Sequence, residues 1–329
     1  NVVKYYYSKD NGSNYVESTS SSYTFSNLTS SATFYVKVYV KDSNNRESSV
    51  SSTSIKTKIP LKEVCSSGTN LASCLKTYSN KVSSITNIYH HDASLANGAG
   101  DNSYRFAGAS SEVNNYVCFG STQSPCPADN LYRIIGVFGE NQTEQRVKLI
   151  KSTSVRYENW DQDYKNTWST SSLNSYLNNE FINTFDTRTD WAAKIAETTW
   201  KVGGFYNSNQ PAKAVYQNEI NSSPSVNNKI GLMYASDYGF AAAPSAWTAN
   251  LNTYNGEAIK SANWMHLGTA EWTISRYAGD SVSAFYVAGD VDYYGVGSLF
   301  SAVRPVFSLT SSVNYVSGSG SAAEPIVVN

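Results

Sequence analysis

The sequence has few charged side chains and no long apolar run. Charged residues make up 16% of the 329 residues and the formal net charge is −1, so the chain has no broad electrostatic field that would hold nucleic acid or an anionic membrane. No apolar run approaches the length of a membrane span. We therefore expect no nucleic-acid partner and no membrane insertion.

Cysteine and histidine are also scarce. The four cysteines form two close pairs, Cys65 with Cys74 and Cys118 with Cys126, without zinc-knuckle spacing, and the three histidines add no ligand pattern. Four cysteines allow three connectivities, and we expect the local one. Local disulfides are typical of an extracellular protein, while four reduced, buried cysteines are the alternative. We predict no cofactor.

Tyrosine, serine, threonine and asparagine are abundant instead. The chain holds 25 Tyr, a composition typical of a strand- and loop-rich secreted protein. Tyr and Ser are favoured in recognition loops because they give contact area and hydrogen bonds at low entropic cost. The composition therefore favours an extracellular protein on a cell surface or a phage particle.

Residues 1–58 are predicted to form strands. Val2–Ser8 precedes an Asp-Asn-Gly turn, Tyr23–Phe25 leads to Leu28, and Phe34–Lys41 alternates with Phe34 on the apolar face. This pattern resembles the second half of a fibronectin type III domain, although Phe34 replaces the tyrosine of that family. The resemblance implies a partial all-β sandwich module that acts as a spacer. The abrupt start, without a signal peptide, indicates an internal fragment.

Residues 59–329 are predicted to form one α+β domain, because a few helices near its start are followed by many short strands. Helices are expected where a cap residue precedes apolar residues at helical spacing: Asn70 before Leu71, Cys74, Leu75 and Val82; Ser171 or Ser172 before Leu173, Tyr176, Leu177 and Phe181; and Trp191–Glu197. Strands are expected at Asn115–Cys118, Tyr132–Phe138, Val147–Ser152, Ile230–Tyr234, Trp272–Arg276, Ala284–Ala288 and Ala302–Leu309.

Short motifs follow one another in this domain: Asn115–Gly120, Leu131–Phe138, Val147–Ile150, Ile230–Phe240, Asn263–Met265, Glu271–Arg276 and Val303–Phe307. In this order they resemble a surface-protein domain that is widespread in gut Gram-positive bacteria. The last part, with Gly297, Ser301 and Val303–Val306, also resembles the C-type-lectin-like fold of the formylglycine-generating-enzyme superfamily. Variable proteins of diversity-generating retroelements share that fold.

The resemblance implies a binding surface between Arg276 and Arg304, with Arg276, Val303, Arg304 and Pro305 as scaffold and Trp264 and Trp272 packed beneath. Exposed aromatic residues among small polar ones suit such a surface, and we favour exposure for Tyr277, Tyr293 and Tyr294 but burial for Phe285. The predicted ligand-binding residues are Tyr277, Asp280, Ser281, Ser283, Val287, Asp290, Asp292, Tyr293, Tyr294, Val296, Ser298, Leu299 and Phe300.

The segment between Arg276 and Arg304 contains no Lys, Glu, Gln, Met or Trp. Adenine-directed mutagenesis of Asn codons that end in a pyrimidine cannot produce these five residue types. It does produce the Tyr, Asp, Gly, Ala, Ser, Val, Phe and Leu that fill the segment. The pattern agrees with diversification by a retroelement, and ordinary family variability is the alternative.

Catalytic patterns are weak. No cysteine follows Cys126, so the formylglycine-generating oxidase activity is not carried over. His90-His91-Asp92 has no accompanying nucleophile motif, and we interpret it as a polar loop. Asp161 with Asp163, and Asp290 with Asp292, lack the ligand count of a calcium loop, so calcium is considered but not predicted.

We therefore expect a non-enzymatic ligand-recognition protein, an adhesin or receptor-binding protein, with a protein or glycan partner on another cell or particle. One alternative is a secreted hydrolase acting on glycan or protein, with a pocket around Asp161, Asp163 and His90. The other is a structural subunit of a surface layer or fibre, in which residues 276–302 are covered by a neighbouring chain.

Overall fold

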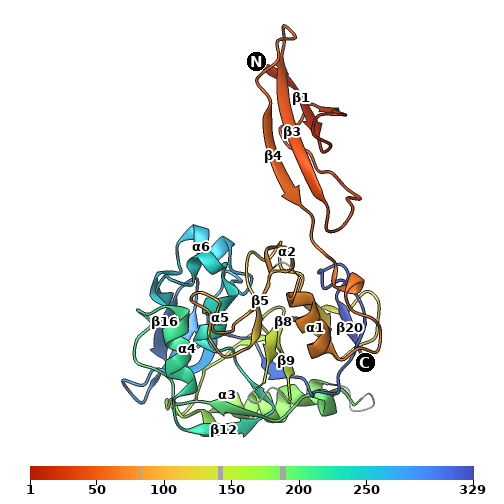
Figure 1. Cartoon of the computed structure of the whole chain (residues 1–329). Coiled ribbons are helices and arrows are strands. Elements are labelled where there is room, and N and C mark those ends of the chain that lie inside the picture. Colours follow the sequence, from red (N-terminus) through yellow and green to blue (C-terminus); the bar gives the residue numbers. More distant parts are fainter. Residues whose placement is uncertain (82, 140–143, 186–189) are drawn as a thin grey trace. The chain divides into compact units, whose positions relative to one another are not determined.

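The computed structural model describes residues 1–81, 83–139, 144–185 and 190–329 (Figure 1). The chain forms two compact units. The first contains Asn1–Pro60 with Ser84–Thr86, and the second contains Leu61–Ser83 and Asn87–Asn329. No helix in the described ranges is long and apolar enough to span a bilayer.

The first unit is an antiparallel sheet in the order β2-β1-β3-β4. Its strands are β1 (Val2–Ser8), β2 (Val16–Ser18), β3 (Thr33–Asp42) and β4 (Ser51–Lys56). Val38 of β3 lies opposite Tyr7 of β1, whose ring stacks on Tyr23 at 5.5 Å. Residues 23–25 form no strand, so the expected strand there is wrong: Tyr23 packs its ring on Tyr7 and on Phe25 instead.

The second unit is built on a large mixed sheet, with a path in the order β13-β18-β9-β8-β7-β20-β19, to which β6 and β5 attach through β8. Its central strands lie in the interior, and in β8 every residue from Tyr132 to Val137 is buried. The strands are β5 (Ile88–His90), β6 (Tyr104–Phe106), β7 (Tyr116–Cys118), β8 (Leu131–Phe138), β9 (Arg146–Lys151), β13 (Ile230–Gly231), β18 (Val306–Ser308), β19 (Tyr315–Ser317) and β20 (Ile326–Val328).

Two smaller sheets complete the strands of this unit. One has the order β10-β17-β14-β15-β16, with β10 (Arg156–Tyr157), β17 (Ala302–Val303), β14 (Glu271–Arg276), β15 (Ser283–Val287) and β16 (Val291–Gly295). The other pairs β11 (Thr198–Lys201) with β12 (Ser225–Asn228). Mixed helices and sheets, with the sheets dominant, are compatible with the predicted α+β class.

Helices are short. The α-helices are α1 (Leu71–Ser79), α2 (Ser83–Thr86), α3 (Ser172–Ser175), α4 (Ala212–Ile220), α5 (Ala235–Ala241) and α6 (Glu257–Ser261). Single turns are η1 (Leu61–Glu63), η2 (Ala128–Asn130), η3 (Trp168–Thr170), η5 (Phe181–Thr184), η6 (Trp191–Lys194), η7 (Pro244–Ala246) and η8 (Leu251–Thr253), and η4 (Tyr176–Glu180) is a π-helix turn. As predicted, Asn70 caps α1 and Ser171 caps α3. Val82 lies outside the described residues.

Aromatic side chains fill the core of the second unit. Trp160, Trp264 and Trp272 are fully buried. The ring of Phe119 packs against Trp191 at 5.0 Å and Phe307 at 5.1 Å, which joins the loop after β7 to β18. Such rings remove large apolar areas from water and so account for much of the folding free energy.

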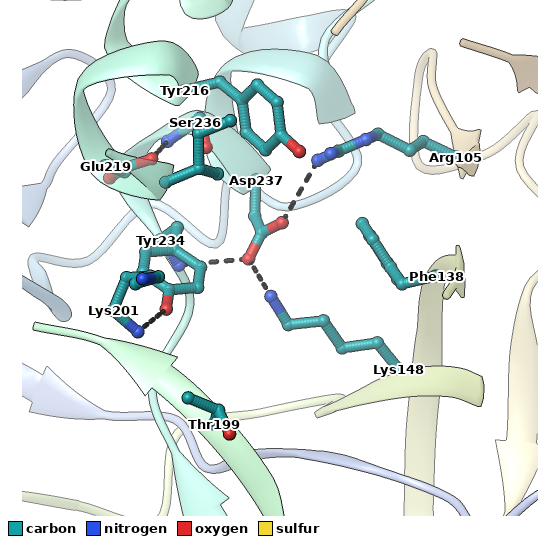
Figure 2. A pocket seen from close by; sticks show the side chains of 11 residues that line it. Arg105, Phe138, Lys148, Thr199, Lys201, Tyr216, Glu219, Tyr234, Ser236 and Asp237 are labelled. Carbon is teal, nitrogen blue, oxygen red and sulfur yellow. Dashed lines mark hydrogen bonds and ion pairs between the residues drawn. The ribbon is translucent and has the colours of Figure 1, made fainter. Parts of the chain in front are cut away.

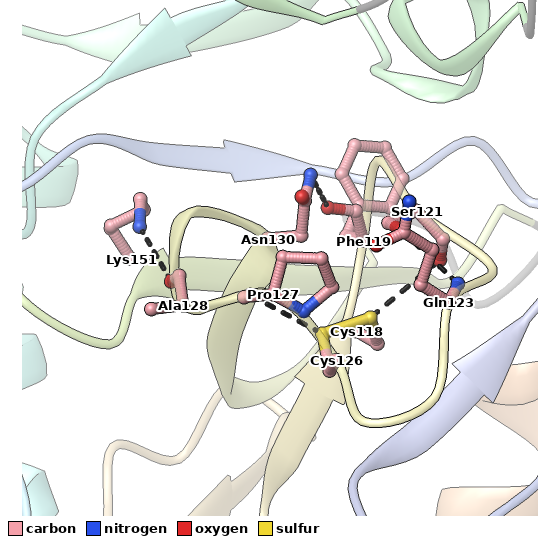
Figure 3. Close-up of a disulfide and its surroundings, with 9 residues drawn as sticks. All are labelled: Cys118, Phe119, Ser121, Gln123, Cys126, Pro127, Ala128, Asn130 and Lys151. Atoms are coloured by element: carbon pink, nitrogen blue, oxygen red, sulfur yellow. Dashed lines mark hydrogen bonds between the residues drawn. A yellow bond between two sulfur atoms is a disulfide. The ribbon is translucent and has the colours of Figure 1, made fainter.

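Both disulfides join the cysteines that the sequence prediction paired. Cys65 is bonded to Cys74 of α1, and Cys118 at the end of β7 is bonded to Cys126 in the following loop. Near the second disulfide, the Asn130 side chain donates to the backbone carbonyl of Phe119 at 3.1 Å (Figure 3). The disulfide and this hydrogen bond hold the loop between β7 and β8.

Strand predictions needed three corrections in this unit. The strand expected over Ala302–Leu309 is divided into β17 and β18, because Pro305 has no N–H for a ladder. The strand expected over Ile230–Tyr234 ends at Gly231, since Tyr234 already caps α5. Residues 291–295 form a strand, where the sequence suggested a loop.

Candidate functional site

The segment predicted to bind a ligand lies on the β15–β16 hairpin. Tyr293 lies opposite Phe285 in the register, and Tyr294 lies opposite Ala284. Successive side chains of a strand point to opposite faces of the sheet. Tyr293 and Tyr294 therefore belong to two separate aromatic clusters, one on each face of the edge strand β16.

The first cluster is a layered stack of rings. Tyr293 stacks on Tyr277 with ring centroids 4.1 Å apart and planes 4° from parallel. Both rings pack edge-on against Phe285, which is fully buried and stacks on Phe205 at 3.9 Å. The outer tyrosines rest on this buried layer, which sets the orientation of their rings.

The second cluster lies on the other face. Phe300 contacts Tyr294 at 5.5 Å and Tyr286 at 5.2 Å, and Tyr286 packs edge-on against the buried Trp272. Phe300 is 47% exposed, Tyr294 is 51% exposed and the neighbouring Leu299 is 64% exposed. Exposed apolar side chains grouped in this way are typical of interaction sites on a soluble domain.

Asp292 and Asp280 have local hydrogen bonds. Asp292 Oδ1 accepts from the N–H of Tyr293 at 2.8 Å. Asp280 Oδ1 accepts from the N–H groups of Val282 and Ser283 at 2.9 and 2.8 Å. These bonds fix the edge strand and the turn before β15, and both carboxylates stay exposed at the surface.

Three predicted contact residues are corrected by their burial. Ser283 is 8% exposed, because its hydroxyl donates to Asp280 and its carbonyl accepts from Asn166. Val287 and Val296 point into the core and are buried. These three residues support the surface from below and cannot touch a ligand.

The remaining predicted contacts lie at the surface to different degrees. Tyr277, Asp290 and Ser298 are half-buried. Asp280, Ser281, Asp292, Tyr293, Tyr294, Leu299 and Phe300 are exposed. We use the term display surface for Tyr277, Asp292, Tyr293, Tyr294, Leu299 and Phe300.

The predicted scaffold residues hold the sheet from inside. Arg304 is completely buried and pairs with Glu271 of β14 at 2.9 Å, and its guanidinium also donates to the carbonyl of Met265. Burial raises the pKa of Glu271 to about 7, against the opposing effect of Arg304. Arg276 donates to the carbonyl of Gly203 at 2.9 Å.

Two exposed tyrosines near the display surface were missed by the sequence analysis. Tyr206 is 71% exposed and follows Phe205, which forms a bridge with Tyr277. Tyr164 lies so close to Gly297 that any side chain at position 297 would collide with its ring. Both come from distant segments, and no spacing in the sequence links them to residues 276–304.

Two residues considered for catalysis, Asp161 and His90, have structural partners. Both carboxylate oxygens of Asp161 accept backbone N–H groups, from Ser172 and Lys165. His90 contacts Asp92 and stacks on Tyr104. None of Asp161, Asp163 and His90 lines the pocket of about 330 Å3 described below. Among the described residues, no group of three or more His, Cys, Asp or Glu is placed to hold a metal ion.

Comparisons with protein-family models, curated proteins and solved structures gave no match to this chain.

Proposed function

We propose that the chain is an extracellular ligand-recognition protein, an adhesin or receptor-binding protein, whose display surface binds a protein or glycan on another cell or particle. The observation that supports this proposal is the pair of exposed aromatic clusters on β16. Aromatic anchors held by a buried layer lose little conformational entropy on binding, which makes them effective contacts. The resemblance to C-type-lectin-like variable proteins points to the same segment of the chain.

An extracellular location, on a bacterial surface or a phage particle, is part of this proposal. Two disulfides close short loops of the chain, and disulfides persist mainly in oxidising surroundings. The proposal extends to diversification of residues 277–303 by a retroelement. A reverse-transcriptase gene and a near-copy of this coding segment next to the gene would support that extension, and their absence would contradict it.

The display surface is tested by removing its side chains while the fold is kept. We expect the triple variant Asp292→Ala, Tyr293→Ala, Tyr294→Ala to lose at least about tenfold in affinity, because aromatic side chains that become buried in an interface dominate recognition. The measurement is binding of the labelled protein to a printed glycan array and, by flow cytometry, to intact bacterial and epithelial cells.

Tyr157→Ala is the matched control. Tyr157 is 58% exposed on β10, at the opposite end of the strand order of the same sheet. Its loss should leave binding unchanged. Equal binding by the triple variant and the natural protein would refute the display surface as the recognition site.

A further inference from the structure

A second candidate binding site is a pocket of about 330 Å3, which falls within the size range of small-molecule sites (Figure 2). No residue of the display surface lines it. Strands β6, β8, β9 and β11 and helices α4 and α5 provide its walls. Four of its lining side chains are apolar or aromatic: Phe138, Tyr216, Ile220 and Tyr234. Four buried charged residues also line it: Arg105, Lys148, Glu219 and Asp237.

Asp237 lies between two buried cations. Lys148 Nζ contacts Asp237 Oδ2 at 2.5 Å, and Arg105 Nη1 contacts Oδ1 at 3.4 Å. Asp237 Oδ2 also accepts from the N–H of Tyr234. Figure 2 shows the Lys148 and Arg105 side chains converging on this carboxylate from different elements.

The ammonium group of Lys148 has more N–H donors than its hydrogen bond to Asp237 uses. An ammonium group carries three N–H donors, and within the described residues Asp237 is the hydrogen-bond acceptor identified for it. Nζ also lies over the rings of Tyr234 and Phe138, 4.8 and 5.3 Å from their centroids. Burial lowers the pKa of Lys148 against the effect of Asp237. A ligand oxygen would satisfy the donors that face these rings.

Above about pH 7, where the carboxyl group of Glu219 is ionised because its pKa is about 7, the charges around the pocket are balanced. The cations Arg105, Lys148 and Lys201 line it together with Asp237 and Glu219, and Asp101 pairs with Arg105 at 2.7 Å. A charged ligand would add an uncompensated charge to a site of low dielectric constant, which is costly. A neutral ligand that both donates and accepts hydrogen bonds avoids that cost.

The geometry points to a neutral, polyhydroxylated ligand the size of a pyranose sugar ring. Its hydroxyl groups would accept from Lys148 and donate to Asp237, whose Oδ1 has one long contact to Arg105. Its C–H face would pack on the rings of Tyr216 and Tyr234, because the electron-rich face of an aromatic ring attracts polarised C–H groups. The pocket is therefore a monosaccharide site, separate from the display surface.

Saturation-transfer difference NMR tests this site with glucose, galactose, mannose and N-acetylglucosamine, each added singly to the full chain. We expect transfer to at least one sugar. Ile220→Trp, at the exposed end of α4, should block the pocket and abolish transfer without altering the charged residues. Lys148→Met should weaken the affinity about tenfold, because one charged hydrogen bond is lost.

The Tyr293→Ala variant should still show saturation transfer to the sugar if the sugar binds in the pocket. It should show none if the sugar binds at the display surface. The experiment therefore distinguishes a failure of the pocket proposal from a failure of the display-surface proposal. Should Lys148→Met fail to fold, as judged by its thermal unfolding, Ile220→Trp still decides the matter. The proposal is overturned if no sugar shows transfer, if transfer survives Ile220→Trp, or if benzoate displaces the sugars and binds more tightly.

Discussion

Gly204 shows how a single residue positions the first aromatic cluster. Its φ is +72°, and a Cβ atom there would collide with the backbone carbonyl of Arg276. The next residue, Phe205, stacks on Phe285 beneath Tyr293. A residue without a side chain is therefore needed to bring Phe205 under the hairpin.

We predict that Gly204→Ala lowers the free energy of unfolding by about 1–3 kcal/mol, because it adds backbone strain and a steric collision. Urea unfolding followed by tryptophan fluorescence measures the loss. Gly295→Ala is the matched control, since nothing lies within 4 Å of a Cβ atom at position 295. If the two variants lost the same free energy of unfolding, the collision at position 204 would have no energetic cost, and the prediction would be wrong.

At the scale of single elements, α1 depends on its cap. Asn70 Oδ1 accepts from the N–H of Ser73 at 3.0 Å, and its side-chain amide donates to the carbonyl of Ser311 at 2.7 Å. The residue therefore fixes the start of α1 and ties it to the segment after β18. Leu71 and Leu75 lie fully buried on the helix that follows.

Replacing Asn70 with alanine should lower the free energy of unfolding by about 1–2 kcal/mol, because the cap and the bond to Ser311 are both lost. Asn70→Asp should recover roughly half of that loss, since its carboxylate still caps the helix but cannot donate. Chemical denaturation of the three proteins gives the comparison. An Asp variant no better than the Ala variant would argue against the cap.

Some elements of this fold could be predicted from the sequence and others could not. The cap at Asn70 and the strand at Tyr132–Phe138 were predictable because they depend on local chemistry and on a continuous apolar run. The strand β16 was not, because its side chains are exposed on both faces and give no alternation. Tyr206 was also not predictable, because only the fold brings its neighbour Phe205 beside Tyr277.

The molecule as a whole carries buried carboxyl groups whose ionisation opposes folding. Glu219 is buried and accepts hydrogen bonds from the N–H groups of Ala235 and Ser236 and from the Ser275 hydroxyl. Burial raises its pKa from 4.5 to about 7. Between these two values the folded protein holds a proton that the unfolded chain has released. The contribution of this bound proton to the free energy of unfolding is therefore complete below pH 4.5, and it is lost as the pH rises through about 7.

We predict that Glu219→Gln flattens the dependence of stability on pH. Its carboxyl group accounts for a loss of about 3 kcal/mol as the pH rises from about 4.5 through about 7, since each pKa unit corresponds to about 1.4 kcal/mol. Urea unfolding at a series of pH values measures the slope. Glu271, whose pKa is also about 7, should maintain part of the slope in the variant. Identical slopes for the two proteins would contradict the assignment to Glu219.

The edge position of β16 bears on how readily the protein evolves. β16 is the last strand in the order of its sheet, and Asp292 bonds to the N–H of Tyr293, which makes the edge a poor template for aggregation. Side chains exposed on both faces of this strand contribute little to the core. New residues at 292–294 would therefore cost little in folding, and under the proposed function they would change which partner is bound, so selection would be free to explore many sequences there.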